Sequence, residues 1–338
     1  MKRKSLGIIF LMMLVGICLS WGGGQSGAAE EVVTLKLGHI SPPASPMGQG
    51  AERFAELVKE RTDGRVIVDV FPSEQLGPAK DELESTMLGN QDIFLEGAVW
   101  YERWSTTLRF LMIPFAFEGR EHFRKWNETP DWKAAWDDVS EQTGLVFLDS
   151  ANWERGPFRL IISKKPIETV DDLKGLKMRV WPSDAYKRSW EALGAKPTEL
   201  AWTDVYLGLK MGTVDACTSP VNLLYSMKFT EVAKYVVYWP EFPQIVRVAM
   251  NKGRFESLKP EYQKILLEAA TEAGELYNEL SLELAENDIQ KVVDEHNAVY
   301  KEIDLKAAAD RMVTQVKAFE AEEYVPPGVY DNIRNLVK

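Results

Sequence analysis

Apolar and polar residues follow two different periods along the chain after residue 32. Residues 33–38 alternate between apolar and polar positions, as a half-buried strand does, and residues 66–71 form the β-branched run of a strand buried on both faces. Between them, the apolar residues of 46–62 recur at helical spacing, and this pattern ends at Gly64. The beginning of the chain therefore predicts a strand, a helix and a second strand.

The same alternation of strand and helix continues through the middle of the chain. We expect helices over residues 78–88, 169–174, 184–193 and 203–212, and strands over 91–95, 145–148, 158–163, 176–181 and 213–217. Thr203 is the expected N-cap of the last of these helices. Alternating strands and helices predict an α/β fold with mostly parallel sheets that carry helices on both sides.

Residues 260–299 have a different character. They are nearly free of glycine, rich in leucine, glutamate and alanine, and begin with Pro260, which the first turn of a helix tolerates. We expect one long helix or a pair of helices packing across domains. A chain of 338 residues is also long enough for two domains of roughly 150 residues each.

The N-terminus has the layout of a secretory signal. Basic residues 2–4 precede an apolar run over 8–19, and small residues lead to Ala29, after which we expect cleavage. The apolar run is shorter than the roughly 18 residues that a membrane span requires. Lipidation at Cys18 is the alternative, but Ile17 stands where a small residue is expected. The sequence thus predicts an exported, periplasmic protein.

The net charge and the cysteine content limit which ligands and which covalent links the protein can have. The formal net charge is −11, whereas a nucleic-acid-binding surface needs a basic face. We therefore expect no nucleic-acid partner, and an anionic ligand would have to meet a local basic site.

Only Cys217 remains after signal cleavage, so no internal disulfide forms, and we interpret this residue as a small buried side chain rather than a nucleophile.

Recognisable catalytic and cofactor motifs are missing from the sequence. His39, His122 and His296 have no second histidine or cysteine at metal-ligand spacing, and no nucleophile elbow, phosphate loop or dinucleotide fingerprint occurs. The acidic clusters at 81–84 and 171–172 are interpreted as lying on helix starts or solvated faces rather than as paired catalytic acids. We expect no metal site, no cofactor and no enzymatic activity.

Two arginines stand within predicted apolar strands. Arg159 and Arg179 would each bury a guanidinium group, which is costly unless the group meets an anion such as a carboxylate. Two interpretations remain open for each arginine: it binds a ligand carboxylate, or it points out of the sheet or pairs with a structural acid. Trp153, Trp181 and Trp202 lie nearby in sequence and could form flat apolar walls or fill the core.

Short motifs along the mature chain resemble one family. They are LGH at 37–39, SP at 45–46, TDGRV at 62–66, FPSEQLG at 71–77, IPFAF at 113–117, KPI at 165–167, DDLKGLKMRV at 171–180, DVY at 204–206 and GTVD at 212–215. In this order and spacing the chain resembles the solute-binding proteins of tripartite ATP-independent periplasmic (TRAP) transporters, of the C4-dicarboxylate-binding type.

The resemblance implies the fold of type II-like periplasmic binding proteins. Two α/β domains would close on a ligand around a hinge, with a long helix bridging both. Domain I would comprise residues 33–155 and 245–284, and domain II residues 156–244 and 285–338. The partners it implies are a small organic acid and the membrane permease subunits of the transporter, which are separate chains.

The resemblance also implies roles for individual residues. In the family, the arginine matching Arg179 forms a paired salt bridge with the ligand carboxylate, and the one matching Arg159 assists. Family members often place an asparagine before the proline matching Pro220, whereas this chain has Ser219, whose hydroxyl can donate one hydrogen bond. The complete set of expected ligand-binding residues is Arg179, Arg159, Ser219, Trp202, Trp181, Trp100 and Trp153.

The character of the ligand follows from the residues around these arginines. Sialic-acid-binding members have polar residues where this chain has Ile40, Ala79, Gly97 and Trp100. We therefore expect an organic acid with an apolar or aromatic body. A small keto or hydroxy acid and a dicarboxylate remain alternatives for the ligand. A ligand-sensing subunit and an exported hydrolase remain alternatives for the function.

Overall fold

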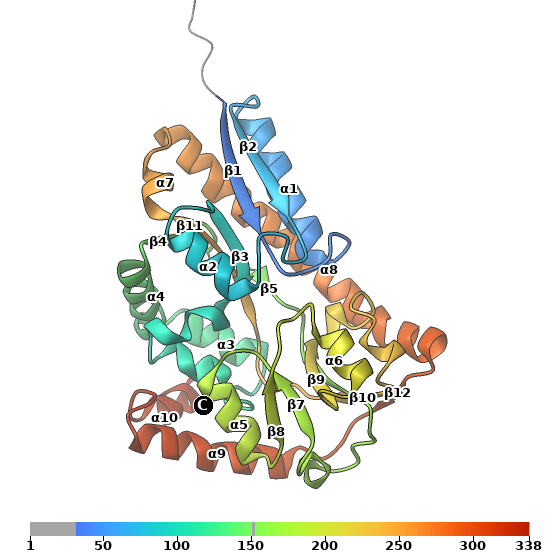
Figure 1. The fold of residues 1–338 in the computed structure, drawn as a ribbon. Coiled ribbons are helices and arrows are strands. Elements are labelled where there is room, and N and C mark those ends of the chain that lie inside the picture. The colour runs from blue at the N-terminus through green and yellow to red at the C-terminus, as the bar shows by residue number, and fades with distance from the viewer. Residues whose placement is uncertain (1–31, 151–152, 338) are drawn as a thin grey trace, which may run out of the picture. The chain divides into compact units, whose positions relative to one another are not determined.

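The computed structural model describes residues 32–150 and 153–337 (Figure 1). The predicted signal peptide, its cleavage after Ala29 and the alternative at Cys18 all concern residues outside this part of the chain. Within the described ranges, no helix is both long and apolar enough to cross a membrane.

A first mixed sheet has the strand order β2-β1-β3-β11-β4, and β5 also pairs with β11. Its strands are β1 (Val33–Gly38), β2 (Val66–Phe71), β3 (Ile93–Gly97), β4 (Leu145–Phe147), β5 (Trp153–Glu154) and β11 (Ile245–Asn251). β1 pairs in parallel with β2 and β3, while β11 runs antiparallel to β3, β4 and β5.

A second mixed sheet has the order β12-β10-β6-β9-β7-β8. Its strands are β6 (Arg159–Ser163), β7 (Lys177–Val180), β8 (Lys196–Glu199), β9 (Ala216–Pro220), β10 (Tyr235–Tyr238) and β12 (Val299–Lys301). β6 runs antiparallel to both of its neighbours, with Arg159 opposite Pro220 on β9. β7 lies on the other side of β9 and pairs with it in parallel, with Arg179 opposite Cys217.

The expectation of mostly parallel sheets is wrong for this protein. Antiparallel pairs surround β6 and β11, each of which follows directly on a strand of the other sheet, β5 and β10 respectively. Such a passage needs no crossover helix, so the returning strand can enter its sheet in either direction. The alternation of strand and helix in the sequence does not reveal where the chain changes sheets.

The α-helices are α1 (Pro46–Arg61), α2 (Ala79–Met87), α3 (Arg120–Asn127), α4 (Pro130–Thr143), α5 (Asp184–Ala192), α6 (Val205–Met211), α7 (Lys252–Glu256), α8 (Pro260–His296), α9 (Lys306–Ala321) and α10 (Val329–Arg334). The α-helices expected over residues 46–62, 78–88, 184–193, 203–212 and 260–299 are present, the segment 169–174 contains a 3-10 helix instead, and α3, α4, α7, α9 and α10 were not predicted. Short 3-10 helices are η1 (Ala98–Trp104), η2 (Leu108–Met112), η3 (Val170–Leu173), η4 (Val221–Leu223), η5 (Phe229–Glu231) and η6 (Asn335–Val337). Ser45 caps α1 by accepting the N–H of Gly48, and Gly144 ends α4 in the left-handed region at φ 67°.

The segment 260–299 forms one continuous helix over most of its length. α8 packs along α1 beside the first sheet, and further along it contacts η4, η5 and β12 of the second (Figure 1). Its first half contributes Leu266, Ala270 and Tyr277 to the apolar cluster that α1 forms with the first sheet. It ends where Asn297 adopts a left-handed conformation. The prediction that a long helix spans both parts of the fold is confirmed.

Two local predictions are wrong. Asp204, and not Thr203, is the N-cap residue of α6, because the Thr203 hydroxyl donates to the carboxylate of Glu74 instead. β9 begins at Ala216, three residues later than expected, because only from there does it pair with β6.

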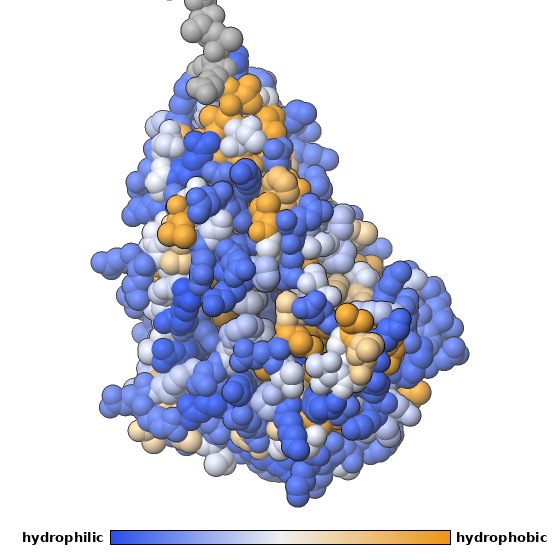
Figure 2. Space-filling view, viewed as in Figure 1, coloured by the Kyte–Doolittle hydropathy of each residue, from blue (hydrophilic) through white to orange (hydrophobic). Residues whose placement is uncertain are grey.

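α6 exposes the apolar side chains of Leu207 and Met211. In Figure 2 apolar atoms are visible over the region of α6 and also over the region of β1 and β2.

Candidate ligand-binding site

A cavity of about 220 Å³ lies between elements of the two sheets. From the first sheet and its helices come β3, η1 and the segment leading into α2, which contribute Glu74, Glu96 and Trp100. From the second come the ends of β6, β7 and β9 and the loop before α6, which contributes Trp202. Most of the lining side chains are apolar, so the charged groups among them are conspicuous.

Arg179 on β7 is the most unusual of these charged groups. Its side chain lines the cavity although the residue is only 5 % exposed. Nε and Nη2 donate to the backbone carbonyl of Leu200 at 3.0 and 2.9 Å, and no carboxylate forms an ion pair with the guanidinium among the described residues. Burial lowers the pKa of this guanidinium to about 10, which still leaves it cationic at neutral pH. Arg179 is thus a buried cation facing a cavity without a carboxylate partner.

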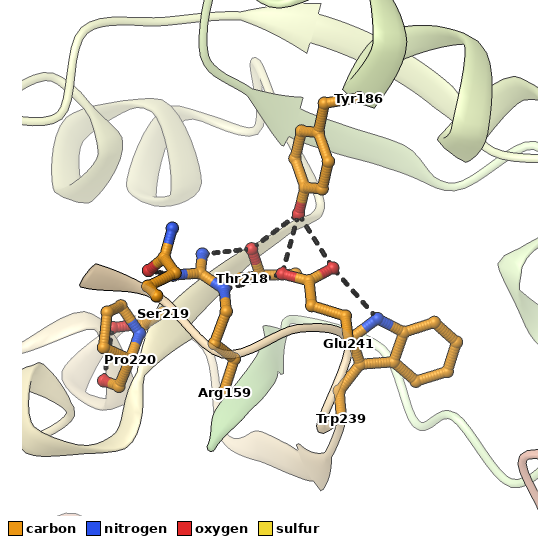
Figure 3. Close-up of polar contacts among 8 residues, drawn as sticks. Arg159, Tyr186, Thr218, Ser219, Pro220, Trp239 and Glu241 are labelled. Atoms are coloured by element: carbon orange, nitrogen blue, oxygen red, sulfur yellow. Dashed lines mark hydrogen bonds and ion pairs between the residues drawn. The ribbon is translucent and has the colours of Figure 1, made fainter. Parts of the chain in front are cut away.

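Arg159 also lines the cavity, but protein groups surround its guanidinium (Figure 3). Nε donates to Oε1 of Glu241 at 2.6 Å, Nη2 donates to the Thr218 hydroxyl at 2.7 Å, and Nη1 donates to the side-chain oxygen of Gln244. The Tyr186 hydroxyl donates to the same Glu241 carboxylate. Arg159 thus pairs with a structural acid, and because it also lines the cavity, its assistance in binding a ligand carboxylate stays a prediction.

Sequence reasoning missed a third arginine of the cavity. Arg155 follows β5, and its Nη2 forms an ion pair with the fully buried carboxylate of Glu96 on β3. Glu96 stands in the apolar strand segment Ile93–Gly97. An acid within such a strand is costly to bury alone, so it was a signal that a cationic partner would be found.

Three of the predicted tryptophans line the cavity. Trp181 stacks on Tyr186 with ring centroids 3.8 Å apart, Trp202 lies beneath the Arg179 guanidinium at 5.2 Å, and Trp100 comes from η1. The indole N–H groups of Trp181 and Trp202 are buried and have no hydrogen-bond partner in the part of the chain that is described. These rings form flat apolar walls beside Arg179.

Two of the predicted ligand-binding residues do not line the cavity. Ser219 is fully buried, and its hydroxyl donates to the carbonyl of Pro220 at 3.0 Å, so it is turned into the protein. Trp153 is also fully buried, packs against the ring of Tyr277, and donates its indole N–H to the carbonyl of Ala270 at 2.8 Å. Trp153 therefore belongs to the core between the first sheet and α8.

Other candidate groups are also found in the interior. Cys217 is buried, as expected, and burial raises its thiol pKa to about 12. Asp81 and Glu82 lie in the first turn of α2, as expected of a helix start, but Glu82 is completely buried rather than solvated, and burial raises its pKa to about 8. Asp81 lines the cavity. Across residues 32–150 and 153–337, no cluster of histidine, cysteine, aspartate or glutamate has the arrangement of a metal site.

Comparison with known proteins agrees with this architecture. Residues 37–323 match the family described as bacterial extracellular solute-binding protein, family 7. The 2,3-diketo-L-gulonate-binding periplasmic protein YiaO of Escherichia coli (strain K12) is 30% identical over 335 residues, which are 97% of each chain. The C4-dicarboxylate-binding periplasmic protein DctP of Rhodobacter capsulatus is 28% identical over 327 residues, 95% of each chain.

A solved structure shares the fold. The TRAP periplasmic solute-binding protein from Sulfitobacter sp. NAS-14.1, crystallised with bound β-D-galacturonate, superimposes with a TM-score of 0.81 at 26% identity, covering 90% of this chain and 98% of that one. Fold and sequence together define a periplasmic-type solute-binding protein. The chain belongs to bacterial extracellular solute-binding protein family 7. The predicted relationship to the binding proteins of TRAP transporters is confirmed, and the relatives named here are binding proteins rather than enzymes.

Proposed function

We propose that this protein captures an organic acid by its carboxylate at Arg179 and delivers it to the membrane permease subunits of a TRAP transporter. The observation that carries the proposal is the buried guanidinium of Arg179, which lines the cavity without a carboxylate partner in the described chain. A buried cation is costly unless an anion neutralises it, and a guanidinium matches the planar geometry of a carboxylate. A ligand carboxylate would supply that missing charge.

Binding would involve closure of two domains, comprising residues 33–155 with 245–284 and residues 156–244 with 285–338. Two hydrogen bonds join residues of these proposed domains beside the cavity. The Ser183 hydroxyl donates to Glu102 at 2.9 Å, and the Thr203 hydroxyl donates to Glu74. Such contacts would hold the domains together around the ligand, and the exclusion of water would strengthen the ion pair at Arg179.

The body of the ligand would lie against Trp100, Trp181 and Trp202, which supports an organic acid with an apolar or aromatic body. The relatives named above suggest alternatives with more oxygen atoms, namely a keto sugar acid or a dicarboxylate. No chemical step is part of the proposal, since the thiol of Cys217 is buried with a raised pKa.

The location we propose is the periplasm, reached by a signal peptide over residues 1–29 that is cleaved after Ala29. The order of basic, apolar and small residues in this segment and the periplasmic relatives support it. Mass spectrometry of the exported protein would test it. An N-terminus at Glu30 is expected, whereas a lipid-modified Cys18 would overturn the assignment.

A thermal-shift screen of residues 30–338 tests the binding function. The panel should contain mono- and dicarboxylates, keto acids, aromatic acids, sugar acids and neutral analogues. A ligand that binds only the folded protein, at a concentration about 100 times its Kd, stabilises it by roughly 2.7 kcal/mol, which such a screen resolves. We expect shifts with carboxylates alone and their loss in Arg179→Gln. Shifts only with neutral compounds, or shifts that persist in Arg179→Gln, would overturn the proposal.

A further inference from the structure

We propose that the cavity selects ligands carrying a single negative charge, and that Glu96 and Glu241 determine this selectivity. The inference rests on the proposed binding function and specifies the class of its ligand. It follows from a comparison of the three arginines that line the cavity, Arg155, Arg159 and Arg179. Two of them have a buried carboxylate of their own, and the third does not.

Arg159 is neutralised by Glu241. The carboxylate is completely buried behind the cavity wall and forms an ion pair of 2.6 Å with Nε of Arg159. Figure 3 shows how Tyr186 and Trp239 hold the same carboxylate from other sides. Glu241, Thr218 and Gln244 accept three of the five N–H groups of the Arg159 guanidinium, so a ligand anion could meet only the two that remain, on a cation that Glu241 already neutralises.

Arg155 is neutralised in the same way by Glu96. Both carboxylate oxygens of Glu96 accept from Nη2 of Arg155, and one of them also accepts the backbone N–H of Gly97 at 2.9 Å. Glu96 is fully buried, and Arg155 is nearly so. A ligand carboxylate at Arg155 would therefore have to displace, or lie beside, another carboxylate.

The remaining charges of the cavity also disfavour a second ligand carboxylate. Lys80, Glu74 and Asp81 complete its charged lining, and neither of these two acids has an ion-pair partner in the described part of the chain. Counted with Glu241, the lining has as many acids as cations. One carboxylate can pair with Arg179. A second would lose part of its hydration and meet Glu74 or Asp81, and the lining cation left besides the arginines is Lys80, whose exposed ammonium group attracts an anion less than a buried guanidinium does.

The primary test uses the unaltered protein and pairs of ligands that differ in one carboxylate. Suitable pairs are hexanoate with adipate, 4-methylbenzoate with terephthalate, and 2-oxohexanoate with 2-oxoadipate, measured by isothermal titration calorimetry. In every pair that shows binding, we expect the monocarboxylate to bind at least tenfold more tightly. Equal or tighter binding of the dicarboxylate would overturn the inference while leaving carboxylate binding, and with it the proposed function, intact.

Two isosteric variants test which residues set the selectivity. Glu241→Gln and Glu96→Gln each remove a negative charge and leave a lining arginine unneutralised. We expect each to improve the affinity for the dicarboxylate relative to its monocarboxylate partner at least tenfold. Glu268→Gln, which removes an exposed acid of α8, is the matched control and should leave the ratio unchanged.

Loss of a buried counter-charge will also lower the stability of these variants. Where a variant is too unstable for calorimetry, its thermal midpoint replaces the affinity. We expect the dicarboxylate to raise this midpoint more than the monocarboxylate does, because it supplies the missing charge. A variant with the unaltered preference for monocarboxylates would show that Glu96 and Glu241 do not set the selectivity. Absence of binding by any carboxylate would instead overturn the proposed function.

Discussion

Arg159 and Arg179 lie on either side of β9, and their replacement should have opposite consequences. Arg179→Gln removes a buried cation that has no acidic partner, whereas Arg159→Gln breaks an ion pair and leaves Glu241 buried alone. The first change should therefore affect ligand binding, and the second should affect the stability of the fold. Both variants introduce the same side chain, so each serves as the control for the other.

The magnitudes follow from the contacts. Loss of one partner of a buried, hydrogen-bonded charge pair weakens binding by about 2–5 kcal/mol, which corresponds to roughly 30-fold to several-thousand-fold in Kd for Arg179→Gln. Without ligand, the hydrogen bonds lost to Leu200 are offset by removal of the buried charge, so the stability should change by less than about 1 kcal/mol. Arg159→Gln should lower the free energy of unfolding by about 3–5 kcal/mol.

Urea unfolding of the ligand-free variants and calorimetric titration with the tightest ligand of the screen measure these two quantities separately. Arg179→Lys adds a further control, because lysine keeps the charge but cannot form the paired hydrogen bonds of a guanidinium. Its affinity should fall between those of the unaltered protein and Arg179→Gln. The reasoning would be refuted if Arg179→Gln retained its affinity within about threefold, a change too small for a lost charge pair, or if it destabilised the ligand-free protein as much as Arg159→Gln does.

Three further predictions concern other buried groups. Glu82 has a raised pKa of about 8, so the folded protein keeps a proton that the unfolded chain loses near the ordinary pKa of a glutamate. The free energy of unfolding should therefore fall as the pH rises from that ordinary pKa to about 8. Glu82→Gln should flatten this decline in urea titrations at several pH values. The Cys217 thiol, with a pKa of about 12, should resist iodoacetamide at pH 8 in the native protein and react after denaturation, as mass spectrometry would show; rapid native labelling would contradict its burial. Trp153→Phe should lower the free energy of unfolding by about 1–2 kcal/mol without changing the affinity for the ligand. Trp202→Phe should mainly weaken ligand binding. The reverse pattern in unfolding and titration experiments would contradict the positions assigned to these two rings.

Much of the fold could be predicted because strand and helix periods are local properties of the sequence. The strand Val33–Gly38 and the helix that begins at Pro46 lie where the pattern placed them, as does the long helix from Pro260. β11 was not among the expected strands, and its direction could not have been predicted in this way. It depends on where the chain passes between the sheets, and the hydrophobic pattern of Ile245–Asn251 is the same for either direction.

In the site, too, the local sequence identified individual residues but could not predict their contacts with residues far away in the chain. The sequence identified Arg159 and Arg179 as costly residues in apolar strands, but it could not distinguish them. The difference is Glu241, which lies 82 residues from Arg159 in the chain and 2.6 Å from it in the fold. Similarly, the composition of residues 81–84 is that of an exposed helix start, and only the packing of α2 onto the first sheet buries Glu82.

The central claim is that a ligand carboxylate pairs with Arg179. A crystal structure of the protein with the tightest-binding carboxylate of the screen tests it most directly. We expect a carboxylate oxygen at about 2.7–2.9 Å from the guanidinium nitrogens of Arg179, as in other charge-assisted hydrogen bonds, with the ligand body against Trp202 and the Arg159–Glu241 ion pair unchanged. A carboxylate bound elsewhere, with the Arg179 guanidinium still facing only the Leu200 carbonyl, would contradict the claim.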